Sequence, residues 1–254
     1  KTNARTVKYK ALTQDEWTQL SYQNRIERIR DYVDERSGGR IGYLHIASMG
    51  SQNQAQFERE AYEYIVGKEA MIIDVRANGG GNVSRMLIEP LRRKVLALNY
   101  SRTNDDANTY PDGAFIGPMV ALLDENSASD GDIFPAMFRE AGLGPLIGKR
   151  SWGGVVGITN RGQLIDGGVV NVPESGLASK TGEWIIEGYG VDPDIEVDND
   201  PQSVIAGKDP QLERAIVEIM AKLKQPVKLP PKPAGPVKTI NRRETSKATE
   251  QGNN

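Results

Sequence analysis

The chain has 254 residues, of which 38% are hydrophobic, and this is enough for one sizeable core or two small ones. Its 32 basic and 34 acidic residues give a formal net charge of −2, and no basic block precedes the tail, which argues against nucleic acid as a partner. The absence of cysteine excludes a disulfide framework and a thiol nucleophile, and a single histidine leaves little for a transition-metal site. No apolar run approaches the ~20 residues of a membrane span.

The first 140 residues alternate between strand and helix patterns. Thr13 is a predicted N-cap, with Asp15 and Glu16 in the first turn of a polar helix that ends at Gly38 and Gly39. The predicted elements are a weakly alternating strand at 1–11, helix 13–36, strand 40–48, helix 52–66, strand 70–76, helix 83–96, strand 115–123 and helix 130–140. In helix 52–66, one face carries Phe57, Ala61, Tyr64 and Ile65. This order predicts an α/β fold with a largely parallel sheet.

The pattern changes from residue 145 onward. Short strands with Gly-rich turns are predicted at 145–149, 154–159 and 168–173, followed by a helix at 210–224 with Asp209 as its cap. Residues 226–254 are rich in Pro, Lys, Thr, Asn and Glu, and we expect them to be a disordered tail. The core is therefore expected at 13–225. Because the chain begins with Lys1 rather than Met, we interpret it as a fragment or processed chain, and its compartment, cytoplasmic or periplasmic, is open.

The segment 125–135 (ENSASDGDIFP) is the most informative for chemistry. It joins a buried strand to a helix, and Ser129 stands at the junction, where free N–H groups of the helix start can hold a developing oxyanion. Ser129 is the candidate nucleophile. The alternative is that Ser127, Ser129 or Asp130 only caps the helix, and from this segment alone capping is the commoner outcome.

Three further segments are unusual. Gly79, Gly80 and Gly81 follow a buried strand, and they are compatible with phosphate binding, with a tight turn, or with an oxyanion hole that uses one N–H from this loop and one from Asp130. The segment 151–157 (SWGGVVG) is compatible with a backbone close to substrate or with loop bracing. Glu187, before another Gly-rich turn, either orients a catalytic group or is a surface carboxylate.

Four motifs occur in register: 74–81 (DVRANGGG), 129–135 (SDGDIFP), 148–158 (GKRSWGGVVGI) and 189–194 (YGVDPD). Together they resemble the C-terminal catalytic domain of tricorn-type proteases, a branch of the C-terminal-processing serine peptidases. The resemblance covers about residues 40–224. It implies a Clp-peptidase/crotonase-like fold, a ββα superhelix, and a serine peptidase that acts on peptide substrates, forms a homo-oligomer and needs no cofactor.

The resemblance also implies residue roles. Ser129 matches the nucleophile, Gly81 and Asp130 match the two N–H donors of the oxyanion hole, and Glu187 matches the acidic member of the relay. The family places its general-base histidine in an upstream domain, ahead of a PDZ domain, so residues 1–12 would be the end of that PDZ domain or a linker. We therefore expect the chain alone to be nearly inactive.

Two positions qualify this expectation. His45 is the sole imidazole that the chain offers to Ser129, but it falls in a predicted core strand, and we interpret it as structural. Some tricorn-type enzymes carry an acid that favours a basic residue before the cut, whereas the matching stretch 98–102 (LNYSR) has none, so the basic preference is in doubt. A crotonase-type acyl-CoA enzyme and a non-catalytic assembly module are the alternatives.

Overall fold

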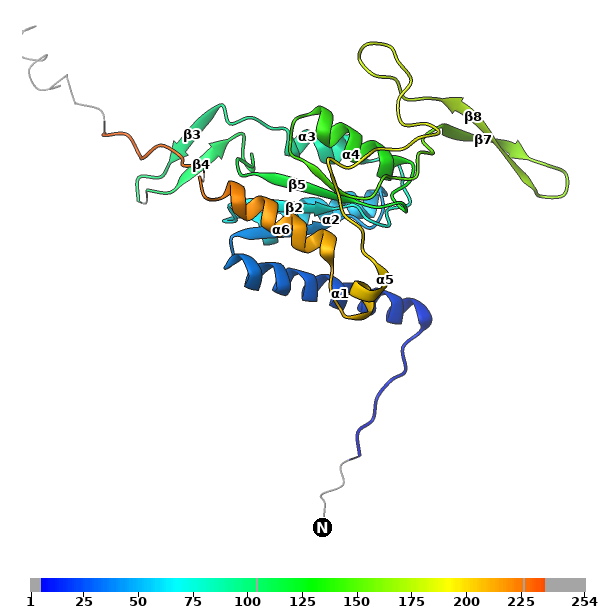
Figure 1. Cartoon of the computed structure of the whole chain (residues 1–254), viewed down its shortest axis with the longest axis horizontal. Helices are drawn as coiled ribbons and strands as arrows, with labels where there is room; N and C mark the ends of the chain where they lie inside the picture. Colours follow the sequence, from blue (N-terminus) through cyan, green and yellow to red (C-terminus); the bar gives the residue numbers. More distant parts are fainter. Residues whose placement is uncertain (1–5, 104, 226, 236–254) are drawn as a thin grey trace, which may run out of the picture.

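The computed structural model describes residues 6–103, 105–225 and 227–235, and it shows an α/β architecture (Figure 1). A five-stranded sheet, in the order β1-β2-β5-β6-β9, forms its centre, and each pair of neighbouring strands is parallel. These strands are β1 (Ile41–His45), β2 (Ala70–Asp74), β5 (Met119–Leu123), β6 (Leu146–Gly148) and β9 (Ile195–Glu196). The predicted α/β class with a largely parallel sheet is confirmed.

Helices cover both faces of the sheet, and each face has its own apolar core (Figure 1). On one face, α1 (Gln14–Ser37) and α6 (Pro210–Lys222) pack against alternate side chains of β1, β2 and β5. On the other face lie α2 (Ser51–Glu60), α3 (Ser84–Leu91) and α4 (Asp130–Glu140). Two-sided coverage explains why β1, β2 and β5 are buried along their whole length, since a parallel sheet needs helices on both faces.

The helix boundaries follow local capping chemistry. Thr13 and Glu16 form a reciprocal capping box at the start of α1, and Gly38 ends the helix in the left-handed conformation. Asp209 accepts a hydrogen bond from the Leu212 N–H at the start of α6. The predicted caps at Thr13 and Asp209 are therefore confirmed.

Several elements differ from the sequence prediction. The predicted helix 52–66 is α2 followed by a π-helical turn, η1 (Ala61–Ile65), which changes the phase of the helix, so that Tyr64 is 39% exposed while Phe57 and Ile65 are buried. The helix predicted at 83–96 is α3, which ends at Leu91, one residue after Pro90. The prediction missed a β-hairpin, β3 (Ala97–Tyr100) with β4 (Ala107–Tyr110), as well as β9 and the short helix α5 (Pro201–Ile205).

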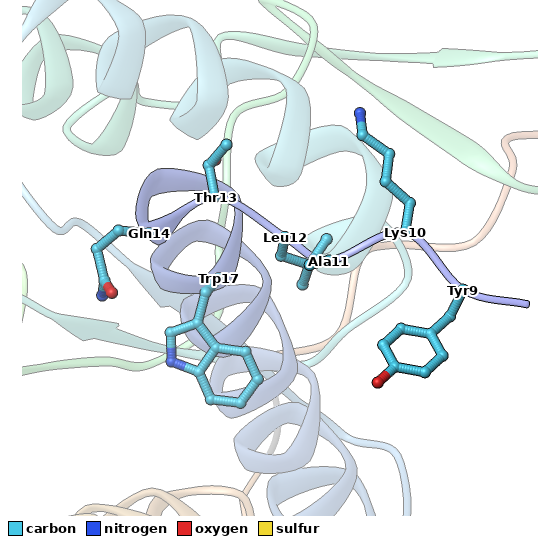
Figure 2. A pocket seen from close by; sticks show the side chains of 7 residues that line it. All are labelled: Tyr9, Lys10, Ala11, Leu12, Thr13, Gln14 and Trp17. Carbon is cyan, nitrogen blue, oxygen red and sulfur yellow. The ribbon is translucent and has the colours of Figure 1, made fainter.

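The strands β7 (Gly157–Gln163) and β8 (Val169–Ser175) form a two-stranded hairpin that projects from the body (Figure 1). Residues 6–12, which lead into α1, have neither helix nor strand, so the strand predicted at 1–11 is absent where it is described. Figure 2 shows this segment leading into α1 beside a shallow hollow, with Tyr9 and Trp17 both largely exposed. Residues 1–5 and 236–254, with the ends of the predicted PDZ remnant and of the tail, lie outside the described residues.

Candidate active site

The candidate nucleophile stands on a sharp turn between β5 and α4. Ser129 has φ 56° and ψ −120°, a backbone conformation that non-glycine residues rarely adopt. Such strain persists only where the surroundings enforce it, and it concentrates at functional sites. Its side chain is partly exposed, and among the described residues its hydroxyl has no hydrogen-bond partner. The structure thus presents a free hydroxyl at the start of a helix.

Neither serine of this turn caps α4 with its side chain. Ser129 occupies the N-cap position of α4, but its side chain makes no capping hydrogen bond. Ser127 is fully buried, and its hydroxyl donates to the Val75 carbonyl at 2.9 Å and accepts from the Asp124 N–H at 3.1 Å. Ser127 therefore holds the turn together, and Ser129 is left available.

The glycine loop packs directly against this turn. A Cβ added to Gly80, whose φ is 101°, would lie 2.6 Å from the Ser129 Cβ and 3.1 Å from the Asp130 nitrogen. A Cβ on Gly81 would lie 2.0 Å from the Met49 carbonyl oxygen. Both contacts are too close for a side chain, so these positions require glycine because two backbones approach each other here. The loop is therefore a close-packed turn beside Ser129.

Two backbone N–H groups next to Ser129 are unpaired within the described part of the chain. The Asp130 N–H belongs to the first turn of α4, where no intrahelical acceptor exists. Gly81 forms a bridge with Met49 in which Met49 donates to the Gly80 carbonyl and Asn82 donates to the Met49 carbonyl, so the Gly81 N–H takes no part. Two unpaired donors therefore lie on the two segments that pack together at Ser129, and a pair of N–H donors of this kind can stabilise an oxyanion.

Asn78 connects the three segments around this site and is itself completely buried. Its side-chain NH₂ donates to the Ile46 carbonyl at 2.6 Å, and its side-chain oxygen accepts the Gly80 N–H at 2.9 Å. Its carbonyl accepts the Ala128 N–H at 2.8 Å. One residue thus fixes the glycine loop and the nucleophile turn relative to the end of β1. The sequence prediction did not single it out.

Two carboxylates at the start of α4 face different neighbours. Asp130 accepts two hydrogen bonds from Ser84, from its backbone N–H and from its hydroxyl. Asp132 is fully buried and accepts the Gly153 N–H at 2.8 Å, while its second oxygen has no hydrogen-bond partner among the described residues. Burial raises the pKa of Asp132, and the nearby Ser151 hydroxyl and the Gly153 N–H offset this only in part.

The loop 151–156 braces the site, as one of its two interpretations expected. The Trp152 N–H donates to the Ser127 carbonyl at 3.0 Å, and a Cβ on Gly153 would lie 2.5 Å from the Gly190 nitrogen. Glu187 is exposed, but its Oε2 accepts the N–H groups of Val155 and Val156 at 2.7 and 2.9 Å. Glu187 is therefore a surface carboxylate with a fixed direction, joined to the nucleophile turn through this loop.

His45, the last residue of β1, belongs to the other face of the sheet. Its Nδ1 lies 2.8 Å from the Tyr22 hydroxyl of α1, and it pairs in register with Asp74. Burial lowers the pKa of His45, and Asp74 offsets part of this effect. Among the described residues, no hydrogen bond joins His45 to Ser129. This environment is that of a core histidine held by α1.

Other site chemistries find little support in the described residues. No group of three or more His, Asp or Glu side chains there is arranged to hold a metal ion. Within the same residues, no helix is both long and apolar enough to cross a bilayer. The segment 98–102 is the one where some tricorn-type enzymes are expected to carry an acid. It lies largely in β3, whose residues are alternately exposed and partly buried.

Comparison with known proteins places this site in a family. The model of peptidase family S41 matches residues 40–197. Tricorn protease homolog 1 of Streptomyces coelicolor is 41% identical over 213 residues, which are 84% of this chain and 20% of that protein. Tricorn protease of Thermoplasma volcanium is 42% identical over 214 residues, 84% of this chain and 21% of that protein. The crystal structure of the tricorn protease superposes with a TM-score of 0.76 at 41% identity, and covers 80% of this chain and 20% of that one.

These matches confirm the tricorn-type resemblance inferred from the four motifs, and they do not favour an acyl-CoA enzyme. The chain spans about a fifth of the length of the curated relatives that it matches. The family model covers 158 of the 254 residues, and it includes the glycine loop, the Ser129 turn, the 151–156 loop and Glu187. The chain belongs to peptidase family S41.

Proposed function

We propose that this chain is the nucleophile-bearing core of a serine peptidase that hydrolyses peptide bonds, in short peptides, by acyl transfer. The observation that carries the proposal is the Ser129 turn, where a free hydroxyl on a strained backbone stands beside the unpaired N–H groups of Gly81 and Asp130. In this mechanism the Ser129 oxygen attacks the scissile carbonyl, and the two N–H groups bind the oxyanion that forms. The general base takes the Ser129 proton and passes it to the amine, which leaves as the scissile C–N bond breaks. Water then hydrolyses the acyl-enzyme, which releases the acid and restores the Ser129 hydroxyl, and the reaction so written needs no metal or organic cofactor.

Glu187 is proposed to orient the charge relay. Its carboxylate is held by two backbone N–H groups through one oxygen, and within the described residues the other oxygen accepts no hydrogen bond. A carboxylate fixed in this way can orient a group that carries the proton, as the acidic member of a triad does. Because Glu187 is exposed, the group that it orients can come from outside this chain.

The general base is proposed to be a histidine outside these 254 residues. His45 is bonded to Tyr22 on the opposite face of the sheet from α4, and burial disfavours its protonated form. The S41 relatives are about five times longer than the segment that matches, so room for such a group exists in proteins of this kind.

The partners are accordingly the remaining domains of the same protein and further copies in a homo-oligomer. The finer expectations stay predictions: a ββα superhelix of the Clp-peptidase/crotonase type, a PDZ remnant at 1–12, and a disordered tail at 226–254.

The experiment that tests the proposal is active-site labelling with a fluorophosphonate, combined with peptide hydrolysis, in the full-length protein. Ser129→Ala should abolish labelling and lower kcat by roughly four orders of magnitude. Ser21→Ala is the control for loss of a hydroxyl, because Ser21 is exposed on α1, on the face of the sheet away from α4, so labelling at Ser129 should persist. A Ser129→Ala protein that retains more than a tenth of wild-type activity would remove Ser129 from the mechanism.

The location of the base is tested separately. The 254-residue chain, the same chain with His45→Gln, and the full-length protein are assayed on the same peptides. A Ser hydroxyl without a positioned base is a weak nucleophile, so the chain alone should show at most the residual catalysis of an oxyanion hole, ~10³–10⁴-fold over water. Robust turnover by the chain that is lost in His45→Gln would instead make His45 the base. An inert full-length protein that resists labelling would favour the assembly-module alternative.

A further inference from the structure

We infer that the side chains of Ser84 and Asp130 are positioning residues that set the separation of the two oxyanion donors. This inference rests on the proposed function, in which the Gly81 and Asp130 N–H groups hold the oxyanion. Ser84 is the first residue of α3, three residues after Gly81, and Asp130 is the first residue of α4. The Asp130 carboxylate accepts the Ser84 N–H at 2.8 Å through Oδ2, and it accepts the Ser84 hydroxyl through Oδ1.

The Ser84–Asp130 pair is unusual as a helix cap. The N-cap residue of α3 is Val83, which has no polar side chain, and no local side chain caps this helix. The acceptor comes instead from Asp130, 46 residues later in the chain, at the start of another helix. A Ser, Thr, Asp or Asn at the N-cap position would be the usual local way to satisfy the N–H groups at a helix start. Only an acceptor on α4 also ties the start of α3 to the start of α4, and these are the two ends that carry the donors.

Both partners of the pair are buried, which gives the connection stiffness. Ser84 is 6% exposed and Asp130 is 5% exposed, so water does not compete for these hydrogen bonds. A charge-assisted bond in such surroundings is stronger than a neutral one at the surface. Both carboxylate oxygens of Asp130 accept hydrogen bonds from Ser84, and within the described residues no hydrogen bond joins this side chain to Ser129. Its carboxylate is therefore not placed to act on the nucleophile itself.

The route from the pair to the donors is short on both sides. On the α4 side, Asp130 carries one donor on its own backbone. On the α3 side, Gly81 is held at Met49 by its bridge, and Gly80 packs against Ser129, so the segment 81–84 is anchored at both ends. Oxyanion stabilisation requires both donors at about 2.7–3.1 Å from one oxygen atom. A displacement of α3 relative to α4 would therefore weaken binding of the transition state and leave binding of the substrate unchanged.

The test uses the full-length protein and three variants, assayed for kcat, for KM and for inhibition by a peptide boronate, which forms a tetrahedral adduct with the nucleophile. Ser84→Ala removes the hydroxyl bond, Ser84→Thr keeps it, and Asp130→Asn removes the charge and one acceptor. The matched control is Ser37→Ala, because Ser37 is also a buried serine (3% exposed) that accepts one backbone hydrogen bond, from Ile41, and it lies at the end of α1.

For Ser84→Ala we expect kcat to fall on the order of 10-fold, with KM within about twofold, since removal of a whole oxyanion donor costs ~10²–10³ and a displaced donor costs less. Boronate affinity should fall by the same factor, Ser84→Thr should restore both, and Asp130→Asn should lose more than Ser84→Ala. A kcat for Ser84→Ala equal to that of Ser37→Ala, or a loss confined to KM, would overturn the inference. If Asp130→Asn does not fold, the Ser84 variants decide the question. The proposed function fails separately, through retained activity in Ser129→Ala.

Discussion

The buried ion pair between Asp74 and Arg76, on the face of the sheet covered by α1 and α6, allows a quantitative prediction. Asp74, the last residue of β2, accepts hydrogen bonds from the Arg76 guanidinium at 2.6–3.1 Å and from the Tyr43 hydroxyl at 2.7 Å. Arg76 also forms a two-pronged contact with Asp209, at 2.8 and 2.9 Å. Asp74 is 1% exposed, so its charge interacts with little screening from solvent. This network joins β2 to the start of α6.

The magnitude follows from the pKa of Asp74. Burial alone would raise that pKa, but the charge of Arg76 and the hydrogen bonds from Arg76 and Tyr43 outweigh burial and lower it from 3.8 to about 2. Because the folded pKa lies below the unfolded one, the contribution to stability is complete above pH 4 and is lost as the pH falls towards 2. A tenfold change in proton affinity corresponds to ~1.4 kcal/mol, so the ionised form contributes about 2 kcal/mol to the free energy of unfolding at pH 7.

The assay is urea unfolding of the wild type and of Asp74→Asn between pH 2.5 and 7. Asn keeps the shape of the side chain, and Arg76 keeps Asp209 as its partner, so the guanidinium is not left unpaired. We expect the variant to be less stable by about 2 kcal/mol at pH 7 and the difference to shrink below pH 4. Asp166→Asn, an exposed aspartate in the turn between β7 and β8, is the control for net charge. A destabilisation by Asp74→Asn that is the same at pH 7 and at pH 2.5 would refute the electrostatic account.

Four further predictions follow from single positions. Burial raises the pKa of Asp132, so ionisation of this carboxylate destabilises the fold as the pH rises above about 4. In Asp132→Asn this pH-dependent loss of stability should be smaller than in the wild type, as measured by urea unfolding at several pH values. Phe138→Ala should lower the free energy of unfolding by about 3–5 kcal/mol, because the ring is completely buried under the sheet, and a loss under 1 kcal/mol would contradict this packing. Gly148→Ala should cost on the order of 2 kcal/mol or more in the same assay, since φ is 137° and the new Cβ would meet the Leu123 carbonyl oxygen at 1.9 Å. His45→Gln in the full-length protein should leave the rate of fluorophosphonate labelling within about threefold, and should lower the melting temperature by a few degrees through loss of the Tyr22 hydrogen bond.

Those parts of the fold that depend on residues close together in the sequence could be predicted from the sequence. The cap at Thr13, the end of α1 at Gly38 and the boundaries of α4 are encoded within a few residues, and they were located correctly. The π-helical turn after α2 and the β3–β4 hairpin were missed, because neither leaves a distinct apolar period. The strand predicted at 40–48 is longer than β1, because backbone pairing with β2, rather than hydrophobicity, decides where the strand ends.

For the candidate site, the sequence predicts where the residues lie along the chain but not which of them are hydrogen-bonded to each other. The place of Ser129 at a strand-to-helix junction could be predicted, because apolar runs and small residues mark such a junction locally. The unpaired state of the Gly81 and Asp130 N–H groups, and the burial that sets Ser127 apart from Ser129, depend on contacts between segments that are distant in the sequence. The bond between Ser84 and Asp130 spans 46 residues, and no local pattern indicates it.

Asn78 has a consequence for how the site opens. Three of its hydrogen bonds reach Ile46, Gly80 and Ala128, so none of these segments can leave its place without breaking a bond to the same buried residue. Local fluctuation, in which a loop frays while its neighbours stay folded, is therefore suppressed here. The amides of Gly80 and Ala128 should exchange their hydrogens with solvent at matching, slow rates, as members of one cooperative unit. The nucleophile turn then keeps its strained geometry because it shares the opening free energy of the sheet beneath it.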